Sequence, residues 1–104
     1  MIHKITLMVG LNDKDTMLQE VNTLDAYKMV GRAIDRDCTI TEGCGIYTHQ
    51  NGEVIFEKSL VVQILDFDGS LDDEWVKNKV EQIKQLLNQE SVAVQHEQID
   101  SKLI

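Results

Sequence analysis

Hydrophobic and polar positions alternate near the start of the chain. In residues 4–11, Ile5, Leu7, Val9 and Leu11 would point to one side, and the residues between them would point to the other. A period of two is typical of a strand with one buried face. This segment is therefore predicted to be the first strand of a sheet.

Two later segments follow the helical period instead. The first is predicted over residues 23–37, with Asn22 or Thr23 as its N-cap. The second is predicted over residues 68–89, with Ser70 as its N-cap. The predicted apolar stripes are Leu24, Tyr27, Val30, Ala33 and Ile34 in the first helix, and Trp75, Val76, Val80, Ile83 and Leu87 in the second.

A β-hairpin is predicted between the two helices. Residues 38–49 and 53–67 are rich in strand-forming residues, and Asn51-Gly52 lies between them. An Asn-Gly pair in this setting favours a tight hairpin because both residues tolerate positive φ. Both faces of the second segment are mainly apolar, so both are expected to be covered.

The order of the predicted elements defines a fold class. Residues 90–99 are predicted to form a last strand, with Val92 and Val94 facing inward. The order β-α-β-β-α-β predicts a ferredoxin-like α+β sandwich, a four-stranded antiparallel sheet with two helices on one face. A chain of 104 residues is the size of one domain, so residues 1–104 are predicted to form a single one.

Such a fold leaves one face of its sheet without helices. The residues predicted on the apolar part of that face are Val61, Leu65 and Phe67, with Met8 and Ala93 alongside. A contiguous exposed apolar patch usually marks an interface, so a homodimer or higher oligomer packed sheet to sheet is predicted. The alternative is that the C-terminal tail and residues 12–22 cover this face.

The composition excludes some partners. The net charge is −8, which disfavours binding to a nucleic-acid backbone or to an anionic membrane surface. No transmembrane run or signal peptide is visible, so a cytoplasmic location is expected. Cys38 and Cys44 are expected to pack as small hydrophobic residues rather than to form a disulfide.

The chain offers little for a metal ion. His49 would lie on the opposite strand face from Cys38 and Cys44, whereas zinc needs convergent ligands. Asp13 and Asp15 supply oxygens near Asn12 but lack the rest of a calcium loop. No metal and no cofactor are predicted.

The candidate binding residues are Tyr47, His49, Glu57, Glu90, Lys28 and Arg32. Glu57 lies on a strand, where its expected place is opposite a residue near Tyr47 on the neighbouring strand. Lys28 and Arg32 are four residues apart on the first predicted helix. That basic stripe could hold a small anionic ligand or an acidic partner.

Three short motifs carry a resemblance to a known family. They are Gly45 with Tyr47, Glu57 to Ser59, and Gln89 to Val92. In these the chain resembles a family of small bacterial and phage proteins of unassigned function. It departs from the family pattern by Ile46 between Gly45 and Tyr47, and by Asn88 where glycine is common. The resemblance supports the fold and implies that Glu57 and Glu90 deserve testing.

No catalytic set converges in the sequence itself. The chain is therefore predicted to be a non-catalytic binding module, an oligomer that sequesters a small ligand or a host protein. A phage-type inhibitor and a sponge for a nucleotide signal are specific versions of this prediction. The alternative is a small enzyme of the dimeric ferredoxin-like type, using Tyr47, His49, Glu57 and His96 in one pocket. A structural or assembly subunit is a third reading, and the sequence leans away from an enzyme.

Overall fold

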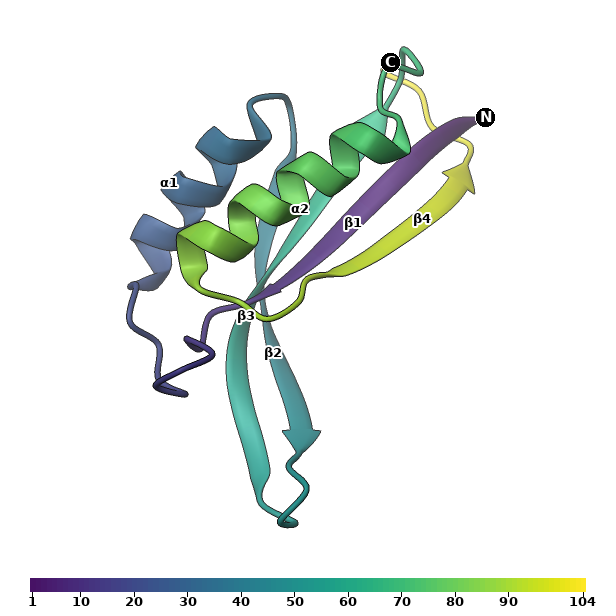
Figure 1. The fold of residues 1–104 in the computed structure, drawn as a ribbon. Helices are drawn as coiled ribbons and strands as arrows, with labels where there is room; N and C mark the ends of the chain where they lie inside the picture. Colours follow the sequence, from purple (N-terminus) through teal and green to yellow (C-terminus); the bar gives the residue numbers. More distant parts are fainter.

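A computed structural model describes residues 1–104 and shows a four-stranded antiparallel sheet with two helices on one face (Figure 1). Its elements are β1 (Ile2–Gly10), α1 (Thr23–Ile34), β2 (Thr39–Thr48), β3 (Val54–Asp66), α2 (Asp73–Leu87) and β4 (Ala93–Ile99). The strand order is β2-β3-β1-β4, with β1 and β3 in the centre. The predicted ferredoxin-like fold is confirmed.

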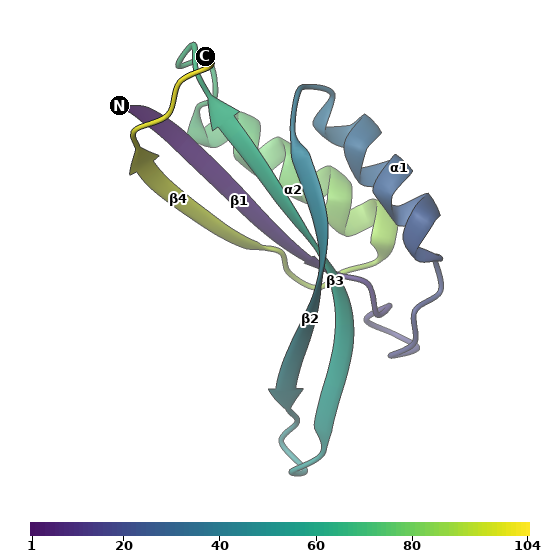
Figure 2. The same ribbon diagram turned by 180° about the vertical axis from the view of Figure 1, so that it is seen from behind.

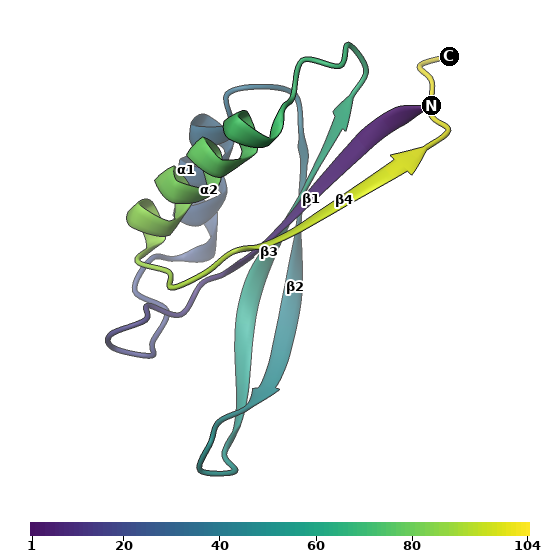
Figure 3. The same ribbon diagram turned by 45° about the vertical axis from the view of Figure 1, so that its right-hand side comes forward.

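The core lies between the helices and the face of the sheet that they cover (Figure 3). Alternate residues of β1 and β3 supply the sheet side, as the period of two predicts. The buried hydrophobic residues are Ile5, Leu7, Val9, Leu11, Ala26, Val30, Ile34, Leu60, Val62, Ile64, Ile83 and Leu87. Burying each of the larger side chains stabilises the fold by about 1.5–3 kcal/mol.

The helix N-caps are asparagine and aspartate. Asn22 Oδ1 accepts a hydrogen bond from the Asp25 amide at 2.9 Å at the start of α1. Asp72 Oδ1 accepts one from the Trp75 amide at 2.8 Å at the start of α2. The prediction of Ser70 as the second N-cap is wrong, because α2 begins only at Asp73 and the Ser70 hydroxyl accepts from Arg36 instead.

Two residues that were predicted to face the core, Leu24 and Val94, are exposed. Leu24 is 63 % exposed, because α1 turns Ala26, Val30 and Ile34 toward the sheet. Val94 is 46 % exposed. It lies on the helix-side face of β4, beyond the part of the sheet that the helices cover (Figure 1).

The predicted hairpin of β2 and β3 is confirmed, but its loop is longer than the predicted tight Asn51-Gly52 turn. Its loop runs from His49 to Glu53, and only Gly52 has a positive φ, of 86°. Pairing of β2 with β3 continues to Thr48 opposite Val54, whereas β1 leaves the sheet at Gly10. The hairpin therefore extends beyond the rest of the sheet as an arm (Figure 2). Val54 and Phe56 are exposed on the arm. In the rest of β3 the prediction that both faces are covered is wrong, because Leu65 and Phe67 remain partly exposed on the face without helices.

The face of the sheet opposite the helices is open (Figure 2). Met8, Leu65 and Phe67 are partly exposed on it, and the polar pair Thr6 and Gln63 lies between Met8 and Leu65. The C-terminal tail reaches only one end of this face, where Leu103 lies beside Leu65 in a shallow hollow. Neither helix is long and apolar enough to cross a membrane.

The N-cap assignment can be tested by substitution. Asp72→Ala is expected to lower the free energy of unfolding by about 1 kcal/mol, because it removes the cap of α2 and one negative charge near the helix N-terminus. Chemical denaturation measures this change. Ser70→Ala is the matched control, with an expected change within about 0.5 kcal/mol. Equal losses in the two variants would contradict the assignment.

Candidate functional site

A hollow of about 520 Å³ lies on the open sheet face, at the point where β1 ends. It is formed by the ends of β1 and β2, the beginning of β3, the loop after β1 and the connection between α2 and β4. The residues that line it are Met8, Gly10, Asn12, Lys14, Met17, Gly45, Tyr47, His49, Glu57, Ser59, Gln89, Glu90, Ser91 and Ala93.

Most of the candidates from the sequence meet in this hollow. Tyr47, His49, Glu57 and Glu90 all line it, although they come from three separate parts of the chain. Lys28 and Arg32 do not, because they lie in another depression on α1. The anionic ligand inferred for that pair stays a prediction.

Glu57 is held at the centre of the hollow by the backbone. It lies opposite Gly45 on β2, two residues beyond Ser59, which forms the last residue pair of β3 with β1. Its carboxylate extends over Gly10, and Oε2 accepts a hydrogen bond from the Asn12 amide at 2.9 Å. The partner near Tyr47 that the sequence predicts is thus Gly45.

Tyr47 is two residues along β2 from Gly45, on the same face as Glu57. Its ring meets the His49 ring edge to face, with 5.5 Å between the centroids. Desolvation, and then the negative charge of Glu57, raise the pKa of the Tyr47 hydroxyl above its ordinary value. The Tyr47 hydroxyl therefore stays protonated to a more alkaline pH than an ordinary tyrosine, and it can donate a hydrogen bond to a ligand at neutral pH.

The hollow has the chemistry of a site for a positively charged organic ligand. Its walls carry two carboxylates, Glu57 and Glu90, and the aromatic ring of Tyr47. Carboxylates and aromatic faces both attract cations. Met8 and Met17 add polarizable apolar surface, and Lys14 is the one cationic side chain that lines the hollow.

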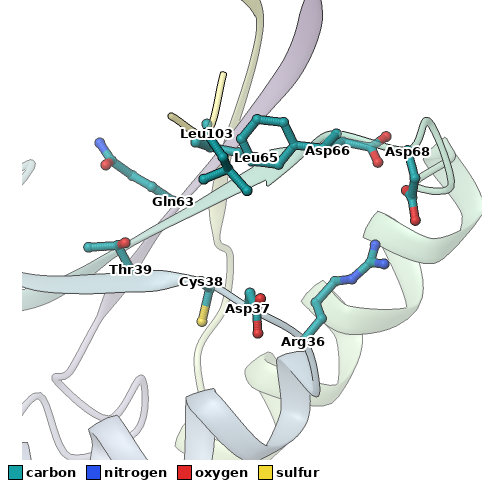
Figure 4. Close-up of a pocket in the computed structure, with 10 residues that line it drawn as sticks. Arg36, Asp37, Cys38, Thr39, Gln63, Leu65, Asp66, Asp68 and Leu103 are labelled. Atoms are coloured by element: carbon teal, nitrogen blue, oxygen red, sulfur yellow. The ribbon is translucent and has the colours of Figure 1, made fainter. Parts of the chain in front are cut away.

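A second hollow, of about 560 Å³, lies at the other end of the sheet (Figure 4). Three of its polar side chains, Arg36, Asp66 and Asp68, already bind the turn before α2. The Asp66 carboxylate accepts hydrogen bonds from the Ser70 and Leu71 amides, both at 3.1 Å. Arg36 donates to the Ser70 hydroxyl at 3.1 Å. We therefore assign this hollow to the fold rather than to a ligand.

The other polar candidates, His96, Asp13 and Asp15, do not line the hollow that contains Glu57. His96 is absent from the hollow that contains Glu57, and its Nε2 lies 2.7 Å from Nδ1 of His3. Asp13 and Asp15 both accept hydrogen bonds from the Asn88 side chain, at 3.0 and 2.8 Å. No group of three or more His, Cys, Asp or Glu side chains is arranged to hold a metal ion.

The cysteines differ from each other. Cys38 is half-buried against the core, and burial raises the pKa of its thiol. Cys44 is exposed, so the expectation that both cysteines pack inside is wrong for Cys44. It lies on the arm, beyond the reach of the helices.

Sequence reasoning missed the residues that set the position of Glu57. Gly10, the Asn12 backbone and Gln89 gain their roles only when β1 and the end of α2 come together. The usable signal was Gly10 at the end of an alternating strand, since glycine there often marks a close approach.

The chain is similar in structure to a phage SAM lyase. A phage SAM lyase in complex with S-methyl-5'-thioadenosine superposes with a TM-score of 0.67 and 25 % identity, covering 92 % of this chain and 80 % of that chain. The same kind of enzyme in its apo state has a TM-score of 0.67 and 26 % identity, covering 91 % and 78 %. A B. subtilis GlnK–ATP complex has a TM-score of 0.48 and 14 % identity, covering 92 % and 84 %.

No protein-family model matches the chain, and no curated protein does either. The family resemblance drawn from the short motifs is therefore supported only in its coarser form, a small phage-like domain with a ferredoxin-type fold.

The similarity to the lyase corrects the functional prediction. A non-catalytic binding module was wrong, and so was the leaning away from an enzyme: the phage SAM lyase structures favour the enzyme alternative. The error has a physical origin. Along the sequence, nothing distinguishes Tyr47, His49 and Glu57 from other residues of a hairpin. Only the pairing of β2 with β3 places them in one hollow.

The electrostatic effect of Glu57 on Tyr47 can be tested without any ligand. Glu57→Gln is expected to lower the pKa of the Tyr47 hydroxyl toward its ordinary value, because the substitution removes a negative charge that opposes tyrosinate formation. Ultraviolet absorbance during alkaline titration measures this. Tyr47→Phe identifies the signal of Tyr27, and Glu53→Gln is the matched control on the same hairpin. An unchanged Tyr47 titration in Glu57→Gln would contradict the geometry.

Proposed function

We propose that this protein is an enzyme that cleaves S-adenosylmethionine (SAM), or a closely related sulfonium nucleoside, with release of S-methyl-5'-thioadenosine. The observation that carries the proposal is the meeting of Tyr47 and Glu57 in one hollow. The similarity to phage SAM lyase over 92 % of the chain supports the substrate class.

The proposed reaction class follows if the S-methyl-5'-thioadenosine in that lyase structure is taken as the product, as we take it here. S-methyl-5'-thioadenosine is SAM without its aminobutyryl group, so the bond between the sulfonium sulfur and the γ-carbon breaks. The electron pair of that bond passes to sulfur, which becomes neutral. A lyase uses no water, so the substrate itself supplies the new bond. Either its own carboxylate attacks the γ-carbon, or a neighbouring C–H proton leaves for a base and an alkene forms.

The hollow suits both routes. The sulfonium and ammonium groups of the substrate are positive, which matches Glu57, Glu90 and the face of Tyr47. Lys14 is available for the substrate carboxylate. In the proposal, Glu57 is the catalytic residue that accepts a proton or a hydrogen bond from the aminobutyryl part, and Tyr47 donates a hydrogen bond there.

The proposal is tested by incubating the purified chain with SAM and quantifying S-methyl-5'-thioadenosine by chromatography. Glu57→Gln is expected to lower kcat/KM by about 100-fold or more, since positioned acid–base groups contribute on that scale. Glu53→Gln, a change of the same kind in the hairpin loop, should keep the native rate.

A purified chain that forms no S-methyl-5'-thioadenosine from SAM would refute the proposed function. Full activity in Glu57→Gln would leave the reaction standing but refute the assignment of the catalytic residue.

We further propose that copies of this chain associate through the open sheet face. Leu65 and Phe67 remain partly exposed there, and Leu103 covers only the end near them. The two free cysteines suit a reducing compartment, so the cytoplasm is the proposed place of action.

Light scattering at micromolar concentration is expected to give a multiple of 11.8 kDa. Leu65→Glu should reduce that mass, because a charge on a desolvated apolar interface is costly. Leu86→Glu, at an exposed leucine on α2, is the control and should leave it unchanged. A native chain with the mass of a monomer would overturn this part of the proposal.

A further inference from the structure

The carboxylate of Glu57 depends on a single backbone donor beyond the end of β1. The Leu11 amide still donates to the Lys58 carbonyl at 2.9 Å, in continuation of the ladder with β3. The next amide, that of Asn12, turns away from the ladder and donates to Glu57 Oε2. The orientation of the peptide around Asn12 therefore sets where the Glu57 carboxylate lies.

Gln89 holds the backbone at Asn12 through the Asn12 carbonyl. Its side chain is buried, with 8 % exposed, directly after the C-terminus of α2. Its Nε2 donates to the Asn12 carbonyl at 2.7 Å and to the Leu87 carbonyl at 3.3 Å. The same residue thus joins the end of α2 to the residue whose amide holds Glu57.

Asn88 supports the same loop at a different place. It has a positive φ of 48°, which explains why glycine would suit this position. Its carbonyl accepts from the Lys14 amide at 3.0 Å, and its side chain holds Asp13 and Asp15. Asn88 anchors the tip of the loop, and of these two residues only Gln89 donates to Asn12. The Asn12 backbone is also paired with Gln19 in an isolated β-bridge within the loop.

Gly10 leaves the space that the Glu57 carboxylate occupies. A Cβ at position 10 would lie 2.5 Å from Oε1 and 2.8 Å from Oε2 of Glu57. These contacts are too short, and the atoms that must move are at the end of a flexible side chain. A methyl group at position 10 would therefore displace the carboxylate and leave the backbone in place.

We propose that Gln89 and Gly10 are positioning residues for the Glu57 carboxylate, Gln89 through the Asn12 amide and Gly10 through the space it leaves. Glutamate at position 89 would not replace Gln89, because both carbonyls need a donor. The loss of catalysis expected from changing Gln89 or Gly10 rests on the proposed function. The position of the Glu57 carboxylate does not depend on that function.

The positioning is tested by NMR on the protein without ligand. In the native chain, the chemical shift of the Asn12 amide proton is expected to follow the titration of Glu57, and Glu57→Gln should abolish that dependence. Gln89→Met and Gly10→Ala should reduce it strongly. Gln85→Met and Gly31→Ala make the same chemical changes on the helices and should leave it intact. A native dependence in Gln89→Met and Gly10→Ala would overturn the proposal.

The consequence is measured with SAM as substrate. Both positioning variants are expected to lose about 100-fold in kcat, with little change in KM, because a displacement of the order of 1 Å has that effect on catalysis. Native kcat in variants whose Asn12 signal has changed would refute the catalytic consequence. If the native chain leaves SAM intact, the proposed function fails while the NMR result still decides the positioning.

Discussion

The unequal length of the two central strands is the constraint on which the rest of the structure depends. β1 has 9 residues and β3 has 13, so their pairing ends at Gly10 and Ser59 while β3 continues beside β2. The next residue of β3 on the open face, Glu57, has no neighbour on the β1 side. Its carboxylate can therefore extend over Gly10 to the first amide beyond the ladder. A longer β1 would fill the hollow with a strand.

The carboxylates of this acidic chain differ in what they contact. Asp66 and Asp72 accept backbone hydrogen bonds that close the turn before α2 and cap the helix. Asp13 and Asp15 hold the loop through Asn88. Such groups are satisfied within the fold, so they add negative charge without offering a site. Glu57 is different because the residue that holds it also lines a hollow with an aromatic donor.

Local patterns in the sequence predicted much of the fold. The alternation from Ile5 to Leu11 gave the buried face of β1, and Asn51-Gly52 marked the hairpin. The N-cap prediction for α2 was wrong because Ser70 and Asp72 are both good caps, and only the start of the helix at Asp73 decides between them. Four candidate residues do share one hollow. The enzyme alternative placed Tyr47, His49 and Glu57 in one pocket but wrongly added His96, because membership depends on strand register rather than on spacing along one element.

The connection from Gln89 to Glu57 shows why the site was harder to predict than the fold. Gln89 and Asn12 are 77 residues apart, and Asn12 and Glu57 are 45 apart. No local period relates them, and Asn12 contributes only its backbone, so its side-chain type carries no signal. A fold can be inferred from repeated local preferences, each of modest energy. A site of this kind depends on a few long-range hydrogen bonds, and those become visible only when α2 and β1 are placed side by side.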